Sequence, residues 1–202
     1  MNDRLRHDED EESARLKRII RAAEELFKRA GFRAVTMEAV AQEASVAKAT
    51  LYSYFKNKDA LYLAVCARMA RLLTKAVEEV LALHSLPLGE RLAQAVIAKH
   101  RMVFTLVRGS PYAKELFSYK DALAADIFAD LDLTILTLLA QAIAQDPQLS
   151  PGAGQLARAL YLGTAELASR STTIGEMEQE LSEFVAVHLA GARALARKEH
   201  KL

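Results

Sequence analysis

The fold of this chain is decided by residues 36–58, which read TMEAVAQEASVAKATLYSYFKNK. Apolar residues at 37–44 follow the spacing of one helix face, and Thr36 is placed to cap that helix with its hydroxyl. The stretch at 44–47 breaks the pattern, and a second short helix is predicted at about 48–54. Two short amphipathic helices joined by so tight a turn predict a helix-turn-helix.

The second of these helices carries the side chains that a duplex-binding helix needs. Leu51 and Phe55 are four residues apart and are expected to face inward, which leaves polar and aromatic side chains outside. Hydroxyl and ammonium groups bind phosphates, and short side chains reach base edges. The predicted DNA-binding residues are Thr36, Lys48, Ala49, Thr50, Tyr52, Ser53, Tyr54, Lys56 and Lys58.

Two of these lysines have specific predicted roles. Lys58 begins the helix that follows the motif, where free backbone amides and the helix dipole also favour an anion, so we expect it to contact phosphate. Lys48 lies at the start of the second short helix, and because lysine can bond guanine we expect it to read a base. Asn57 is predicted to cap the helix after the motif.

This stretch resembles the DNA-binding domain of the TetR family of bacterial repressors. The family pattern is a Thr-initiated helix, an Ala-Gly-Val-Ser turn, a Thr-Leu-Tyr-x-x-Phe core and then Lys-x-Lys, and residues 44–47, 50–55 and 56–58 follow it. Residues 22–27 and the Gly31-Phe32 pair look like the family's first helix and its glycine stop. The resemblance implies a homodimer that represses transcription at a palindromic double-stranded DNA operator and is released by a small-molecule effector.

Three positions depart from the family pattern. Ser45 replaces the turn glycine, and it tolerates a positive backbone angle less well. Ala47 replaces the capping serine, which removes a cap worth about 1 kcal/mol. Ala49 replaces a glycine within the second helix and should stiffen it.

Composition favours a helical chain in two parts. Of 202 residues 51% are hydrophobic, and only 8 are glycine and 4 proline. A lone cysteine suits a reducing cytoplasm, and no run approaches the roughly 18 apolar residues of a membrane span, so we expect a cytoplasmic protein without a membrane partner. The predicted fold is all-α, with a three-helix helix-turn-helix DNA-binding domain at 13–65 and a helical ligand-binding and dimerisation domain at 66–202.

Charge is distributed unevenly along the chain. The formal net charge is only +1, but residues 13–65 hold ten Lys or Arg against five Asp or Glu, a difference of +5 that attracts a polyanion. Residues 1–12 contain a run of five acids and are predicted to form a disordered, solvated tail. The alternative is that this acidic run competes with DNA for the basic face.

The rest of the chain reads as helices. They are expected at about 58–83, 90–108, 112–119, 122–145, 153–169 and 175–198. Residues 133–140 are apolar almost all round, which predicts a central helix. The last two helices are long and amphipathic, so they can form a four-helix bundle with a second copy; alternatively, they only close the core of the monomer.

The middle helices are the expected effector site, although each candidate residue there also has an ordinary structural reading, as core or surface. His100 shares a helix face with Phe104, and the break at 109–111 would let the following helix shift when a ligand binds. The predicted lining residues are Cys66, Met69, His100, Arg101, Phe104, Arg108, Tyr112, Phe117 and Tyr161.

Enzyme signatures are lacking in the sequence. It has no phosphate-binding glycine loop and no Gly-x-Ser-x-Gly elbow, and its five histidines have no metal-ligand spacing. We therefore predict no catalytic residue, no metal and no cofactor. The alternative function is a DNA-bound interaction protein of the same fold that answers to a protein partner and binds no small molecule.

Overall fold

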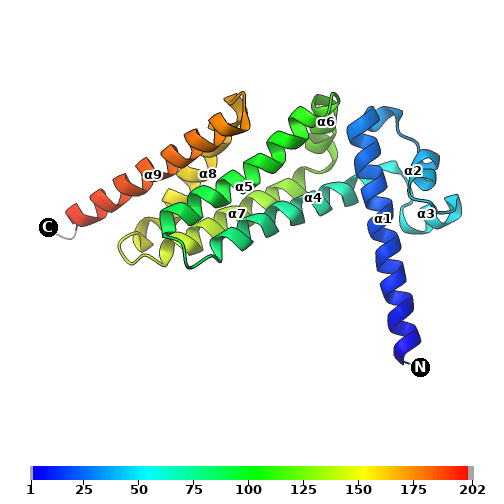
Figure 1. Cartoon of the computed structure of the whole chain (residues 1–202), viewed down its shortest axis with the longest axis horizontal. Coiled ribbons are helices and arrows are strands. Elements are labelled where there is room, and N and C mark those ends of the chain that lie inside the picture. The colour runs from blue at the N-terminus through cyan, green and yellow to red at the C-terminus, as the bar shows by residue number, and fades with distance from the viewer. Residues whose placement is uncertain (1, 200–202) are drawn as a thin grey trace. The chain divides into compact units, whose positions relative to one another are not determined.

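A computed structural model describes residues 2–199, without the side chains of 2–10, Phe117, Lys120 and Glu199. Within this range the chain forms nine α-helices, one 3-10 helix and no strand, which confirms the predicted all-α class (Figure 1). The elements are α1 Asn2–Ala34, α2 Met37–Glu43, α3 Lys48–Tyr54, α4 Lys58–Leu81, α5 Leu88–Gly109, α6 Ala113–Leu123, α7 Ala125–Ala144, η1 Ser150–Gly152, α8 Ala153–Arg170 and α9 Ile174–Glu199.

The helix ends near the motif follow from single residues. The Thr36 hydroxyl accepts from the Ala39 amide at 3.1 Å, and the Asn57 side chain accepts from the Ala60 amide at 2.8 Å, so both predicted caps are confirmed. Gly31 has a φ of 79° and leaves helical geometry within the span of α1. The predicted glycine stop is therefore a kink that redirects the chain toward α2.

The disordered tail at 1–12 stays a prediction, and in the structure residues 2–12 belong to α1. The helix begins at Asn2 and continues without interruption into the predicted first helix. No glycine or proline occurs before Gly31, so nothing in the local sequence stops the helix.

The chain divides into two compact units. The first unit consists of residues 1–69 and 106–127, and the second of residues 70–105 and 128–202. The first unit is thus larger than the predicted DNA-binding domain, because the end of α5, all of α6 and the start of α7 belong to it.

An aromatic cluster forms part of the core of the first unit. Phe27 and Phe32 of α1 have ring centroids 5.5 Å apart, and Phe32 lies 5.1 Å from Tyr62 of α4 and 4.3 Å from Tyr119 of α6. The Tyr62 hydroxyl donates to the Leu116 carbonyl of α6 at 2.7 Å. These contacts join α6 to the helices that carry the motif.

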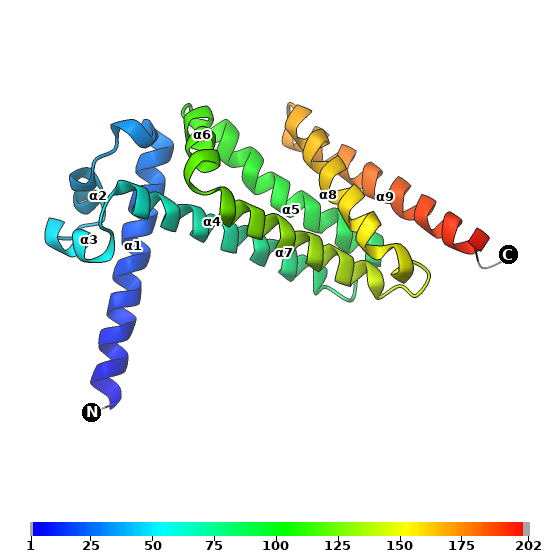
Figure 2. The ribbon, with the colours of Figure 1, turned by 180° about the vertical axis from the view of Figure 1, so that it is seen from behind.

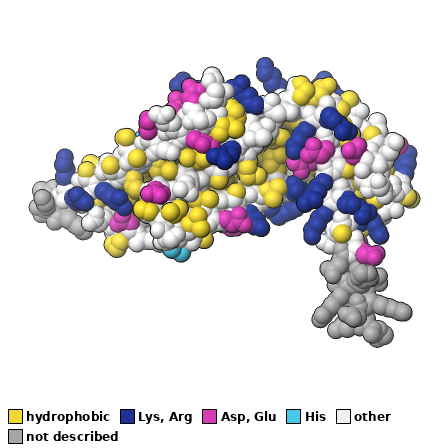
Figure 3. Space-filling view, in the orientation of Figure 1, with side chains coloured by type: hydrophobic (Ala, Val, Ile, Leu, Met, Phe, Trp, Pro, Cys, Tyr) yellow, Lys and Arg dark blue, Asp and Glu magenta, His cyan; other side chains and the backbone are white. Residues whose placement is uncertain are grey.

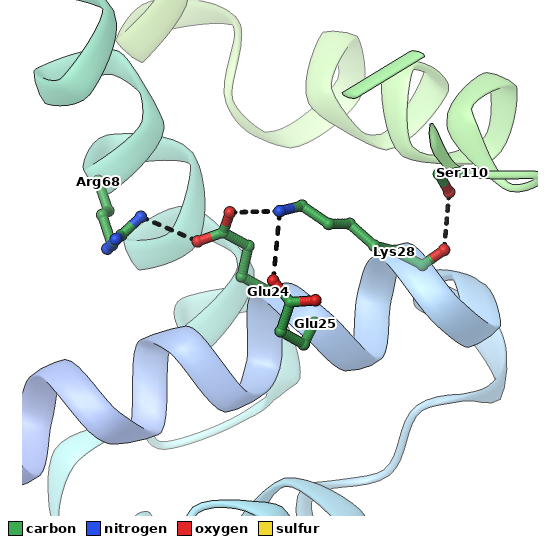
Figure 4. Close-up of polar contacts among 5 residues, drawn as sticks. All are labelled: Glu24, Glu25, Lys28, Arg68 and Ser110. Atoms are coloured by element: carbon green, nitrogen blue, oxygen red, sulfur yellow. Dashed lines mark hydrogen bonds and ion pairs between the residues drawn. The ribbon is translucent and has the colours of Figure 1, made fainter. Parts of the chain in front are cut away.

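Polar contacts join the same elements (Figure 4). Glu24 accepts from Lys28 at 2.6 Å and from Arg68 of α4 at 2.9 Å, while Lys28 also reaches Glu25 at 3.4 Å. The Ser110 hydroxyl, in the segment before α6, donates to the Lys28 carbonyl at 2.8 Å. Because Glu24 is mostly buried and binds two cations, it holds α1 and α4 in register.

In the second unit, α8 and α9 lie side by side, as Figures 1 and 2 both show. Leu160, Leu181 and Val185 are completely buried in this unit. Gly163 allows the close approach, since a Cβ atom at this position would lie 2.1 Å from the Phe184 ring. The glycine that interrupts the α8 pattern is therefore required by packing.

Helix α7 is less central than predicted. Ile135 and Leu139 are buried, but Leu133 is 66% exposed, and only 28% of the most apolar window of the helix is buried. The prediction was wrong because a helix that is apolar all round need not be covered all round. By length and composition α7 could cross a membrane, but a single such helix is weak support for a span, because core helices of soluble proteins meet the same criterion.

Candidate nucleic-acid interface

The turn between α2 and α3 uses the backbone conformation that the family pattern requires. Ser45 has a φ of 52° and is the one non-glycine residue with positive φ in the described chain. Its amide donates to the Gln42 carbonyl at 3.0 Å, and the Val46 amide donates to the Ala41 carbonyl at 2.9 Å. The turn therefore forms with serine in place of glycine, at the expense of backbone strain.

Helix α3 presents the face that the spacing predicts. Leu51 and Phe55 are buried, and these two side chains fix the helix on the first unit. The predicted DNA-binding residues of α3 lie on the other side. The exposed ones are Lys48, Ala49, Tyr52 and Ser53, and the half-buried ones are Thr50 and Tyr54.

Lys48 makes the main polar contact on this face. Its ammonium pairs with the Glu38 carboxylate of α2 and lies 5.8 Å from the centre of the Tyr52 ring. The hydrogen bond to Glu38 raises the pKa of Lys48, so the side chain is a cation at neutral pH. Both partners are well exposed, and an ion pair of this kind is weak enough to exchange for a phosphate or a base.

Lys58 is oriented differently from the prediction. Its ammonium donates to the carbonyls of Phe32, Val35 and Arg33 at 2.8, 2.9 and 3.2 Å, and it lies 4.5 Å from the centre of the Phe32 ring. Its three N–H groups are thereby occupied. In this arrangement Lys58 joins α4 to the segment that follows the Gly31 kink. The phosphate contact stays a prediction, and it would require the ammonium to leave these carbonyls. The long, flexible stem lets the ammonium turn inward.

The hydroxyls near α3 keep part of their bonding capacity. Thr36 uses its oxygen as the cap acceptor, so its proton remains available to a phosphate. Ser53 donates its proton to the Thr50 carbonyl at 2.7 Å and can only accept from a base. Lys56 is exposed directly after α3.

A polar groove of about 580 Å³ adjoins α3. It is lined by residues of α1 and α3: Glu11, Glu12, Arg15, Thr50, Ser53 and Tyr54. Figure 3 shows Lys and Arg side chains gathered over the described part of α1. Arg15 was not predicted as a DNA-binding residue and entered only the count of positive charge at 13–65. Its basic side chain on the first helix was the signal that could have identified it.

The predicted effector residues are divided between the two units. The first unit holds Cys66, Met69, Arg108, Tyr112 and Phe117. The side chain of Phe117 is not among those that the structure describes. The second unit holds His100, Arg101, Phe104 and Tyr161. Of the eight whose side chains the structure describes, Cys66, His100 and Tyr161 are buried.

Arg101 has a defined partner. It donates to the Glu178 carboxylate of α9 from Nε at 2.8 Å and also from Nη2, while its own side chain remains exposed. The pair links α5 to α9 within the second unit.

A second polar cluster joins α5, α7 and α8. The Tyr161 hydroxyl donates to the Asp132 carboxylate, and the Lys99 ammonium lies 3.9 Å from the centre of the Tyr161 ring. Burial lowers the pKa of Lys99 to about 8 and that of His100 to about 3. Lys99 was not predicted as a site residue, although it falls on the buried stripe of α5 with Leu92 and Val96.

A family model and a known relative each match part of the chain. Residues 19–65 match the family model described as bacterial regulatory proteins, tetR family. An HTH-type transcriptional regulator of Bacillus subtilis (strain 168), YhgD, is 34% identical over 84 residues, which are 42% of this chain and 44% of that protein. The chain thus matches less than half the length of this relative.

Solved structures extend the likeness to the whole fold. A TetR-family regulator of Mesorhizobium loti MAFF303099 has a TM-score of 0.63 at 20% identity, over 88% of this chain and 96% of that one. The transcriptional regulator FadR of Bacillus subtilis, solved in complex with stearoyl-CoA, has a TM-score of 0.59 at 21% identity, over 84% and 96%. At such identities the likeness shows the fold alone.

Proposed function

The chain belongs to the TetR family of bacterial transcriptional regulators, and we propose that it represses transcription by binding a palindromic operator as a homodimer in the cytoplasm. Each copy would place α3 in a major groove. A small molecule bound in the C-terminal domain would release the repressor from the operator.

The observation that carries this proposal is the exposed face of α3. Leu51 and Phe55 anchor the helix, while Lys48, Tyr52 and Ser53 project from it in the part of the chain with excess positive charge. Short polar side chains on a rigid helix can reach base edges, and nearby lysines and hydroxyls can bind phosphates.

Duplex binding by single-lysine variants tests the role of α3. Lys48→Ala should weaken binding to a random-sequence duplex and lower the slope of log affinity against log salt, because one cation is removed from the interface. The matched control is Lys75→Ala: Lys75 is also exposed and also paired with a glutamate, Glu79 at 3.5 Å, but it lies on α4 in the second unit. Equal behaviour of the two variants would exclude α3 from the interface.

The surface of α8 and α9 supports the proposed homodimer. Leu162, Val187 and Leu195 are 55%, 68% and 64% exposed, which is unusual for large aliphatic side chains on two neighbouring helices. Burial in a four-helix bundle with a second copy would remove them from water. Sedimentation should show a dimer that Val187→Glu dissociates, whereas Leu83→Glu, at a side chain 44% exposed in the loop after α4, should leave it intact.

Helix α6 is the proposed route from effector to DNA. The Glu115 carboxylate accepts from the Arg33 amide at 2.8 Å, and the Arg33 guanidinium donates to the Tyr119 hydroxyl at 3.3 Å. A shift of α6 would therefore move the end of α1 and the motif after it. A ligand can cause this only if it binds one arrangement more tightly than the other.

A thermal-shift screen separates the two kinds of regulator. A protein with an effector pocket should be stabilised by some hydrophobic small molecules, because a ligand of the native state raises its melting temperature. A library that stabilises nothing, together with release of DNA by a partner protein, would favour the alternative function.

A further inference from the structure

Lys99 is a buried cation without an anionic partner. Only 8% of its surface is exposed, and among the described residues its ammonium has no hydrogen bond or ion pair. The ammonium lies over the face of the Tyr161 ring, 3.9 Å from its centre. Lysines are almost never buried so deeply unless they are paired, so this position requires an explanation.

The neighbouring groups do not supply the missing partner. The Asp132 carboxylate accepts from Tyr161 and attracts Lys99 only from beyond ion-pair distance. His100, the next residue along α5, is 6% exposed, and its Nε2 atom has no hydrogen-bond partner. Buried polar side-chain atoms are nearly always satisfied, so the unpartnered His100 Nε2, next to a buried lysine without an anionic partner, makes this part of α5 unusual.

We propose that Lys99 and His100 form the head-group site for the effector, and that the effector is a monocarboxylate with an apolar body. This inference rests on the proposed function, since it names the class of ligand that the regulator senses. One carboxylate oxygen would accept from the Lys99 ammonium and the other from the His100 Nε2–H. The Tyr161 ring would lie beside the head group.

The charges of Lys99 and His100 favour a ligand with a single negative charge. Burial and the adjacent Lys99 hold the pKa of His100 near 3, so His100 is neutral at pH 7 and only Lys99 is a cation. A carboxylate neutralises this one ammonium, whereas a phosphate dianion would bring an uncompensated charge into the same environment.

The adjacent helix surface favours an apolar body. Leu92, Ala95 and Val96 precede Lys99 by one to two turns on the same stripe of α5 and are buried. Leu160 of α8, beside Tyr161, is also buried. The surroundings of the head-group site are therefore aliphatic, which suits a ligand with an apolar body better than a polar one.

Calorimetry on the full-length protein tests the proposal with a panel of carboxylates and neutral analogues. The probes are butanoate, octanoate, benzoate and phenylacetate, with octan-1-ol and benzamide as neutral counterparts and octyl phosphate as a dianion. At least one carboxylate should bind, and Lys99→Met should weaken it by about 10- to 100-fold, the usual effect of losing a charged hydrogen bond. His100→Phe should weaken it less, and the control Lys75→Met not at all.

Three results would overturn the proposal: no carboxylate of the panel binds, the neutral counterpart or octyl phosphate binds as tightly, or Lys99→Met binds the carboxylate unchanged. Operator binding, measured in parallel on a duplex enriched from a random pool, separates this failure from failure of the proposed function. A protein that binds the duplex and is released only by neutral molecules remains a regulator but lacks the proposed head-group site.

Discussion

Replacing Lys99 with methionine should stabilise the ligand-free protein. Burial lowers the pKa of Lys99 from 10.5 to about 8, which means that folding disfavours its charged form. One pH unit corresponds to about 1.4 kcal/mol, so the charge costs on the order of 3 kcal/mol of folding free energy at pH 7. Methionine has a similar length and no charge, so Lys99→Met removes this cost and keeps most of the packing.

The pH dependence has a definite sign. Between pH 8 and 10.5 the unfolded chain binds the Lys99 proton more tightly than the folded chain, so stability rises with pH in this range. Below pH 8 both states are protonated and the cost is constant. The advantage of Lys99→Met over the wild type should therefore be largest at pH 7 and about 2 kcal/mol smaller at pH 9.5.

Urea unfolding at pH 7 and pH 9.5 measures both quantities. Comparing variant with wild type at each pH cancels the other groups that titrate, and Lys75→Met, at an exposed lysine, serves as control. A variant that is less stable than the wild type at pH 7, or an advantage that does not change with pH, would refute the reasoning.

Three further substitutions test the structure elsewhere. Ser45→Gly should stabilise the protein by about 1 kcal/mol in urea unfolding, because glycine adopts the φ of 52° without strain; no gain would show that the serine is not strained there. Gly163→Ala should destabilise by about 1–3 kcal/mol, since its Cβ would overlap the Phe184 ring, whereas Gly154→Ala on the same helix, with nothing within 4 Å, should not; equal effects would contradict the close packing. Lys58→Met should cost about 2 kcal/mol of stability and leave the salt slope of DNA binding unchanged, because its ammonium binds backbone carbonyls. The control Lys56→Met, at an exposed lysine, should lower that slope by about one without affecting stability. The reverse pattern would show that Lys58 contacts phosphate.

Much of the fold could be predicted because its signals are local. Thr36 and Asn57 cap helices with their own side chains, and Gly31 bends the chain because of its own backbone freedom. Each of these effects involves residues within a few positions, so a single sequence contains all the information. The same holds for Leu51 and Phe55, whose spacing alone fixes which face of α3 is buried.

The orientations of long side chains could not be predicted. Lys58 can reach a phosphate or three carbonyls of a segment more than twenty positions away, and only the tertiary structure decides between them. The environment of Lys99 likewise depends on α7 and α8, which are distant in sequence. Leu133 lies in an apolar stretch that predicts burial, but its side chain is exposed because one face of α7 is not covered by other helices.

The division of the predicted effector residues between two units could not be predicted either, because it also depends on the tertiary structure. The periodicity of α5 places His100 and Phe104 on one face, but it does not show that the contacts of this helix change near residue 106. The lining of the effector site therefore stays a prediction. Within it, His100 has the strongest physical support, because it is buried and its Nε2 atom has no hydrogen-bond partner. The adjacent Lys99, which the sequence did not predict, is buried without an anionic partner.

Selection of bound duplexes from a random pool, performed in parallel with the wild type and Lys48→Ala, tests the central claim most directly. We expect the wild type to enrich two inverted half-sites, one for each α3 of a dimer, and Lys48→Ala to relax one base position in each half-site. Enrichment of a sequence without inverted symmetry, or of an identical sequence by both proteins, would contradict the claim that α3 reads the operator in pairs.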